Sequence, residues 1–398
     1  MKPIKPLFCK KADWHGRTGY LIGNQFIRLT VLTGGGHIAD LRFEDSVGTT
    51  GVSPLWIPPW RTIDPQCYRE KVHVRQYGTL AEGKLLSGIV GHSICLDYFG
   101  SSSAEEVKQG LSLHGEAPSS RWQANGISVG PRRVALTMSV RLSAAGLRFS
   151  REIELKKGES VVYIQEVVCN ERSADHFFHW TQHVTLGLPF LSSGEAVVTI
   201  PGTKGLTYPH GYDEGKALLA SNRVFRWPMA PLANGGTVDL RHPFSHKGLG
   251  FVVGILLDRR KEIGFIAAMN RNLGLLIAYC FKRSDFPWVA IWEENLAVAA
   301  PPWKLRTCAR GLEFGTTPLP VSRREAFVSG RRFGEPTLTC VPALGRKRVN
   351  YLALLARIPD GFGDVKDIDL VRDQVLIYGR ARKKPVVMRA VGVEKLLD

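Results

Sequence analysis

The chain has 398 residues, of which 44% are hydrophobic, so it can bury a sizeable core in one large domain or two ordinary ones. No stretch approaches the roughly 18 uninterrupted apolar residues of a membrane-spanning helix, and Met1 to Pro6 open no apolar run typical of a signal peptide, so we expect no membrane association and a cytoplasmic location. The formal net charge is +17, but the basic residues lie in short scattered clusters without a known nucleic-acid-binding motif, so we expect no nucleic acid as partner.

Alternation of apolar and polar residues predicts β-strands almost throughout the chain. In chain order we expect strands at 26–32, 37–43, 134–142, 147–155, 161–168, 250–257, 263–269, 273–279, 288–292, 307–314, 350–355 and 375–378, and a short helical turn at 104–109. So many strands with Gly- and Pro-rich connections are typical of a sandwich. We therefore predict an all-β fold, a large antiparallel β-sandwich, as a single domain over 1–398. Residues 346–398 are either added strands of the sandwich or a small appendage.

The seven cysteines are scattered, odd in number and never in Cys-x-x-Cys spacing. This pattern predicts reduced thiols and neither a disulfide framework nor a metal site.

The positive charge leaves two interpretations open. It favours an anionic or phosphorylated small ligand, or it serves only solubility.

Three short motifs carry the candidate chemistry. In the strand around Thr181-Gln182-His183, alternation places Trp180 and Gln182 on one face and only polar residues on the other, namely His179, Thr181, His183 and Thr185. That polar face belongs either to a solvent-facing outer strand or to a ligand cleft.

The late motif Gly311-Leu312-Glu313-Phe314-Gly315 sets one glutamate among small side chains. Ala309, Gly311, Glu313 and Gly315 share a face, which leaves space beside the carboxylate. An ordinary edge glutamate next to a turn glycine would give the same pattern. In the early motif Leu113-His114-Gly115 the histidine stands at an expected strand end, where it can reach a pocket or serve as a cap.

The ordered set of motifs resembles the galactose mutarotase-like superfamily, which contains the aldose 1-epimerases. Members have a Leu-His-Gly segment, a later Asn-His in a strand and a C-terminal glutamate. The resemblance covers about Asn24 to Leu355 and includes the segments 33–41, 54–56 and 286–295. It implies the large β-sandwich of that superfamily.

The resemblance also implies roles for particular residues. Glu313 would be the general base that takes the proton of the anomeric hydroxyl, and His183 the acid that protonates the ring oxygen. His114 would hydrogen-bond the ring oxygen or its neighbour, and Trp292 and Glu293 would contact the substrate. No metal or organic cofactor is implied, and the expected ligand is a monosaccharide or a sugar phosphate.

The chain departs from the family pattern at three places. Gln182 stands where the family has Asn, His92 stands nearest a family arginine, and Arg241-His242-Pro243-Phe244 replaces Asp-His-Pro-Phe. We predict that His92 or Arg241 lines the cleft and favours an anionic sugar, because a guanidinium matches such groups with two hydrogen bonds. Arg241 could equally point outward.

Three functions therefore remain open: an aldose 1-epimerase, a noncatalytic carbohydrate-binding or sensor protein on the same scaffold, and another sugar-active enzyme such as a lyase or isomerase. In each case Trp56, Trp60, Trp180 and Trp292 would either stack on the sugar or pack in the core. We expect His114, His183 and Glu313 to converge on one concave face.

Overall fold

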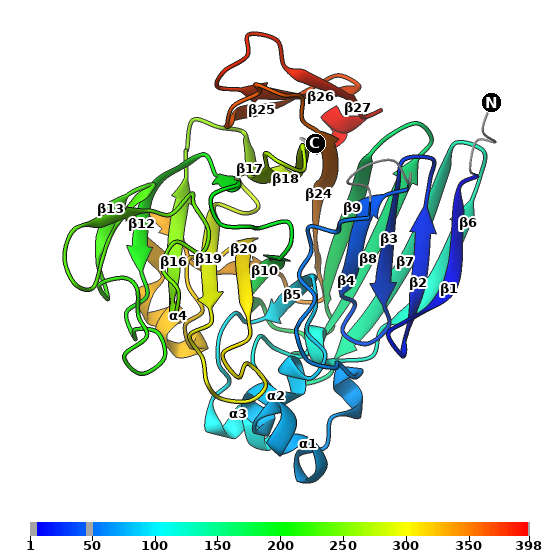
Figure 1. Cartoon of the computed structure of the whole chain (residues 1–398). Helices are drawn as coiled ribbons and strands as arrows, with labels where there is room; N and C mark the ends of the chain where they lie inside the picture. The colour runs from blue at the N-terminus through cyan, green and yellow to red at the C-terminus, as the bar shows by residue number, and fades with distance from the viewer. Residues whose placement is uncertain (1–5, 45–50, 397–398) are drawn as a thin grey trace.

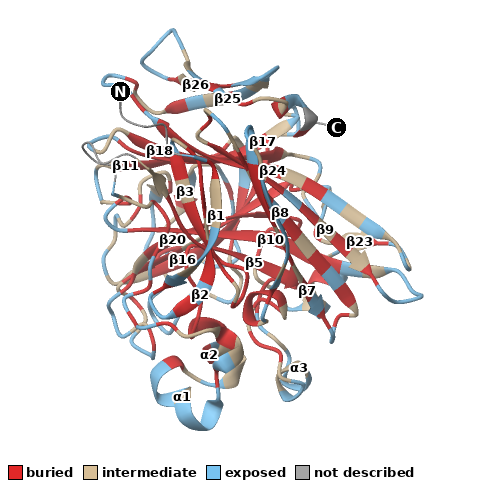
Figure 2. Cartoon of the chain, turned by 90° about the vertical axis from the view of Figure 1, so that its right-hand side faces the viewer, coloured by how far each residue is buried: buried red, intermediate tan, exposed pale blue. Residues whose placement is uncertain are grey.

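The computed structural model describes residues 6–44 and 51–396. Two large antiparallel sheets lie face to face, and their facing sides form the core (Figure 1). The expected all-β antiparallel sandwich is therefore confirmed. In Figure 2 the strands at the centre are coloured as buried, whereas most of α1 at one end is exposed.

The larger sheet has 12 strands and carries the functional residues. Eleven follow one another in space in the order β1 (Phe8–Trp14), β2 (Arg17–Gly23), β3 (Ile27–Leu32), β4 (Ile38–Phe43), β5 (His92–Asp97), β10 (His176–Gly187), β20 (Cys308–Gly315), β19 (Trp288–Asn295), β16 (Leu249–Leu257), β12 (Gly202–Thr207) and β13 (Val224–Arg226). The twelfth strand, β23 (Thr339–Val341), pairs with the start of β10.

The second sheet has eight strands, which pair in the order β11 (Ala196–Thr199), β17 (Ile263–Asn270), β18 (Leu275–Lys282), β24 (Arg346–Arg357), β9 (Val161–Asn170), β8 (Leu147–Lys156), β7 (Arg133–Leu142) and β6 (Gln123–Val129). The predicted alternation is observed here, because Leu136, Phe149 and Ile164 point into the core from adjacent strands. Two short hairpins lie outside the sheets: β14 (Met229–Pro231) with β15 (Thr237–Asp239), and β21 (Arg331–Arg332) with β22 (Glu335–Pro336).

Helices are short and lie at the ends of strands. The expected turn at 104–109 is present as α3 (Ala104–Lys108), but α1 (Glu70–Tyr77), α2 (Leu80–Leu86) and α4 (Arg323–Ser329) were not predicted. Helices of seven or eight residues span only two turns, too few to display a period of 3.6 in the sequence. Single 3₁₀ turns occur at Pro65–Cys67 (η1), Ala117–Ser119 (η2) and Val393–Leu396 (η3).

The C-terminal region contains both kinds of structure that the sequence left open. Strand β24 is an interior strand of the eight-stranded sheet. The strands β25 (Val365–Val371), β26 (Gln374–Gly379) and β27 (Val386–Arg389) form a separate small sheet. Its apolar residues pack on the outer face of β17, β18 and β24, so this sheet has a second core of its own.

A buried polar network fixes β10 within the core. The Glu166 carboxylate is fully buried and accepts hydrogen bonds from Arg151 Nε (2.7 Å), Gln182 Nε2 (2.6 Å), Tyr351 Oη (2.8 Å) and Trp180 Nε1 (3.0 Å). Gln182 and Trp180 thereby tie β10 to the opposite sheet. Because side chains alternate along a strand, His183 points to the other face of the sheet.

Candidate active site

A cavity of about 430 Å³ lies on the face of the 12-stranded sheet that points away from the core. Its floor includes His183, Glu313, Trp292 and Val252, which come from β10, β20, β19 and β16. Its walls come from four segments, which contribute lining residues within 82–89, 99–114, 208–213 and 298–303, and from Trp56 and Pro320. The polar face predicted for β10 therefore belongs to a cavity and not to a solvent-facing strand.

His183 and Glu313 lie directly opposite each other on the neighbouring strands β10 and β20. His183 Nε2 is 3.1 Å from Glu313 Oε1, and the two side chains are only 7% and 2% exposed. The contact is not aligned as a hydrogen bond, and no described residue hydrogen-bonds this carboxylate oxygen. On its other side, His183 Nδ1 lies 3.0 Å from Thr185 Oγ1, which holds the ring in place. The pair thus presents an imidazole and a carboxylate side by side to the cavity.

Gly311 provides the space that the Glu313 carboxylate occupies. A Cβ atom added at Gly311 would lie 2.2 Å from Glu313 Oε1, closer than any real contact of that kind. The backbone of Gly311 does not have a positive φ, so an alanine can adopt its conformation. The small-residue pattern around Glu313 therefore has a direct structural reason.

We expect Gly311→Ala to displace the Glu313 carboxylate while the fold is retained. A misplacement of about 1 Å can cost roughly 100-fold in rate, whereas a strand alanine in place of glycine changes the free energy of unfolding by at most about 1 kcal/mol. The measurements are the catalytic rate and the thermal midpoint of unfolding of the variant and the wild-type protein. Gly126→Ala is the matched control, because a Cβ there meets no atom closer than 3.9 Å. Full activity in Gly311→Ala would refute this role of Gly311.

His114 lies beside this pair, and the centroids of the His114 and His183 rings are 5.3 Å apart. It does not stand at a strand end, as we expected, but in the connection between α3 and η2, with φ of 67°. The Gly100 N–H donates to His114 Nδ1 at 3.1 Å, so the ring proton is on Nε2. Since His114 lines the cavity, this N–H can donate to a ligand.

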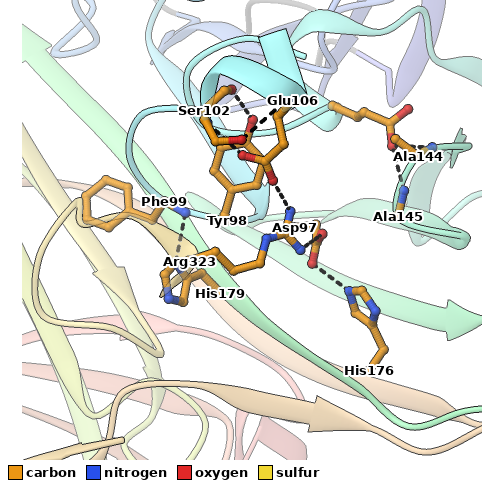
Figure 3. A network of polar contacts seen from close by, with 12 residues as sticks. Asp97, Tyr98, Phe99, Ser102, Glu106, Ala144, Ala145, His176, His179 and Arg323 are labelled. Atoms are coloured by element: carbon orange, nitrogen blue, oxygen red, sulfur yellow. Dashed lines mark hydrogen bonds and ion pairs between the residues drawn. The ribbon is translucent and has the colours of Figure 1, made fainter. Parts of the chain in front are cut away.

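An ion-pair network surrounds residues 97–106, the segment that contains Gly100, the hydrogen-bond partner of His114 (Figure 3). Asp97, at the end of β5, accepts from Arg323 Nη1 at 2.6 Å and from His176 Nε2 at 2.7 Å. Arg323 also pairs with Glu106, and the Phe99 N–H donates to His179 Nδ1 at 3.0 Å. Burial acts to raise the pKa of Asp97, but the contacts with His176 and Arg323 keep it below its usual value. The network joins β5, β10 and α4 around residues 97–106.

A second carboxylate organises the opposite wall. Glu294 accepts the Tyr212 hydroxyl at 2.6 Å and the backbone N–H groups of Ala297 and Val298 at 2.6 and 3.0 Å. The Trp292 indole N–H donates to the Tyr212 hydroxyl at 3.1 Å. Glu294 thus holds two wall segments and the Trp292 ring in one arrangement.

The structure brings four predicted site residues together and excludes three. Glu313, His183, His114 and Trp292 line the cavity, whereas His92, Arg241 and Glu293 do not. Their predicted place in the cleft is wrong.

Each excluded residue has a different reason for its position. His92 points into the core between the sheets, where its Nε2 lies 3.1 Å from Gln182 Oε1. Arg241 folds back on Asp239, with Nε 3.0 Å from Oδ1. Glu293 points away from the cavity and forms a buried ion pair with Arg310, with Nε 2.7 Å from Oε2.

The tryptophans divide in the same way. Trp56 and Trp292 line the cavity. Trp60 packs behind Trp56 and donates to the Leu86 carbonyl, and Trp180 lies in the core. Stacking on a ligand is therefore open only to the first two and to Trp303, which we did not predict.

Several residues of the site were not predicted, and the sequence pattern could have identified one of them, Glu294, which holds the cavity wall but is not a lining residue. Glu294 is two residues from Trp292, so strand alternation selects it for the same face and excludes Glu293. Tyr212 and Trp303 lie in connections between strands, and no pattern in the sequence marked their place in the cavity.

Within residues 6–44 and 51–396, no three His, Cys, Asp or Glu side chains are arranged to hold a metal ion. None of the helices in that part of the chain is long and apolar enough to cross a membrane.

No protein-family model and no curated protein matches the sequence. Solved structures match the fold. A candidate aldose 1-epimerase from Klebsiella pneumoniae is 16% identical, has a TM-score of 0.61, and matches over 85% of this chain and 79% of that one. A galactose mutarotase-like protein from Clostridium acetobutylicum is 12% identical, with a TM-score of 0.58 and 89% and 99% of the two chains covered. A candidate aldose 1-epimerase from Escherichia coli is 13% identical, with a TM-score of 0.54 and coverage of 86% and 100%.

Proposed function

We propose that this chain, which has the fold of the galactose mutarotase-like proteins, interconverts the anomers of an aldose by opening and reclosing the sugar ring. The observation that carries the proposal is the 3.1 Å contact between His183 and Glu313 inside a cavity. An acid and a base side by side suit a reaction in which one proton leaves and another arrives.

The reaction needs only these two groups. Glu313 takes the proton of the anomeric hydroxyl, the oxygen electrons form the C1 carbonyl, and the C1–O5 bond breaks while His183 protonates O5. Rotation about C1–C2 turns the other face of the aldehyde toward O5. His183 then removes the O5 proton, Glu313 returns a proton to the carbonyl oxygen, and the opposite anomer forms. Atoms and protons balance over the cycle.

His114 would hold the sugar during these steps. Burial lowers the pKa of His114 well below its usual value, so the ring is neutral and donates from Nε2. A neutral donor to the ring oxygen orients the sugar without competing with His183 for the proton.

Burial shifts the pKa values of the two central groups in opposite directions. Burial lowers the pKa of His183 to about 4 and raises the pKa of Glu313 well above its usual value, so burial favours a neutral imidazole beside a protonated carboxyl group. The reactive pair, a carboxylate beside an imidazolium, has the same total number of protons. It differs only in which of the two groups, 3.1 Å apart, carries the proton.

We therefore expect kcat/KM for anomer exchange to be independent of pH between the pKa of His183 and the raised pKa of Glu313. On the acid side, the pair gains a second proton near the pKa of His183, about 4, and the base is lost. On the alkaline side, the pair loses its shared proton above the raised pKa of Glu313, and the acid is lost. The measurement is the exchange rate against pH with the uncatalysed rate subtracted, and circular dichroism checks that the protein stays folded. An acid limb near pH 6.5, the ordinary histidine value, would contradict this assignment.

Saturation-transfer NMR of the two anomeric protons tests the function directly. We expect added protein to raise the exchange rate of at least one aldose above the uncatalysed rate. Binding without faster exchange would support the noncatalytic sugar-binding function instead.

A further inference from the structure

The wall of the cavity has no positive charge. None of the described residues that line it is lysine or arginine, and three are carboxylates, Glu82, Asp213 and Glu313. A phosphate or carboxylate on the ligand would lose its hydration here without gaining a cation, at a cost of several kcal/mol. The expected preference for an anionic sugar therefore has no support in the cavity.

One flank of the cavity is aliphatic. Leu85, Leu86 and Ile89, which precede β5, line it together with Leu113. Aromatic rings such as Trp56 occur in many sugar sites because they stack on the C–H faces of the ring. Glu82, from the same helix as Leu85 and Leu86, also lines the cavity, but it is exposed whereas the two leucines are buried. Branched aliphatic side chains offer neither a stacking plane nor a hydrogen bond, so a hydroxyl that faces these leucines would be left unpaired.

The opposite flank is polar. Tyr208, Tyr212 and Asp213 line it and come from the segment that follows β12. In the sheet order β5-β10-β20-β19-β16-β12, the aliphatic flank lies beyond β5 and the polar flank beyond β12. His183 and Glu313, on β10 and β20, lie between the two flanks.

We propose that the preferred substrate is an uncharged 6-deoxy aldose, with its C5 methyl group against the aliphatic flank and its ring hydroxyls toward the polar flank. This inference rests on the proposed function, because it places the anomeric carbon and the ring oxygen at Glu313 and His183. C5 lies on one side of that reacting centre and C2 and C3 on the other, so the two flanks receive different parts of the ring.

The expected selectivity has a definite size. An apolar pocket rejects a ligand that only adds a hydroxyl by roughly 10- to 100-fold. A phosphate at the same carbon is excluded more strongly, because the lining holds carboxylates and no cation.

Two matched sets of sugars test the proposal on the whole protein. One set is 6-deoxy-D-galactose, D-galactose and D-galactose 6-phosphate, and the other is the corresponding set of glucose configuration. Calorimetry gives the affinity of each sugar and saturation-transfer NMR gives its exchange rate. In at least one set we expect the deoxy sugar to bind at least 10-fold more tightly than the parent hexose and the phosphate to bind least.

The two measurements separate failure of the inference from failure of the function. Deoxy sugars that bind best but exchange no faster would refute the enzyme and retain the ligand class. Exchange with equal or better use of the parent hexose or the phosphate would retain the enzyme and refute the ligand class. Absence of binding by all six sugars at millimolar concentration would refute both.

Leu113→Asn tests the aliphatic flank itself. Leu113 is only partly buried and lines the cavity, so an amide there can hydrogen-bond a C6 hydroxyl. We expect the preference for the deoxy sugar to fall below about threefold. Leu344→Asn, at a leucine that is 73% exposed, is the matched control and should keep the wild-type preference. An unchanged preference in folded Leu113→Asn would refute the proposed orientation, and the wild-type comparison stands if that variant fails to fold.

Discussion

Glu313→Gln should abolish catalysed anomer exchange while sugar affinity changes little. Glutamine keeps the size of the side chain but cannot take a proton, and loss of a general base costs about 100- to 10,000-fold in rate. Hydrogen bonding and stacking also act in the ground state, so they persist in the variant. Saturation-transfer NMR measures the rate, and calorimetry measures the affinity for the same sugar.

Glu313→Gln should change the rate without lowering the stability of the fold. Burial already favours the uncharged form of the Glu313 carboxyl group, so an uncharged amide should not lower stability. Glu105→Gln, on the exposed surface of α3, is the matched control for loss of one negative charge and should keep full activity. If Glu313→Gln kept more than a tenth of the wild-type rate, another group would be the base.

Glu166→Gln should produce the largest loss of stability. Glu166 is completely buried, and it balances the charge of Arg151, which is only 1% exposed. Removing one partner of a buried ion pair leaves the other charge without compensation and costs about 3–5 kcal/mol. The amide would also turn an N–H₂ group toward donors, because all four contacts of Glu166 are donated to its carboxylate.

Urea unfolding followed by circular dichroism measures this loss. Glu152→Gln, on the exposed face of β8, is the control and should change the free energy of unfolding by less than about 0.5 kcal/mol. Equal midpoints for the two variants would contradict the stabilising role of the contact between Glu166 and Arg151.

The sequence alone determined the local features of the chain. Side-chain alternation is a property of consecutive residues, so it correctly separated His183 and Thr185 from Trp180 and Gln182 on β10. It also placed Glu313 beside Gly311, and it predicted the antiparallel sandwich from the number of strands and turns. The resemblance implied the fold, which the solved structures share at 12–16% identity.

Strand order and register decided the rest, because they depend on pairing between segments that are far apart in the chain. The pairing of β10 with β20 sets His183 opposite Glu313, and the pairing of β10 with β5 turns His92 into the core beside Gln182. A shift of one residue in the second pairing would have turned His92 toward the cavity. The direction of the Arg241 side chain depends on a neighbouring residue, because its guanidinium pairs with Asp239 and does not line the cavity. The site is thus composed of locally readable side chains, but only the tertiary pairing selects which of them meet.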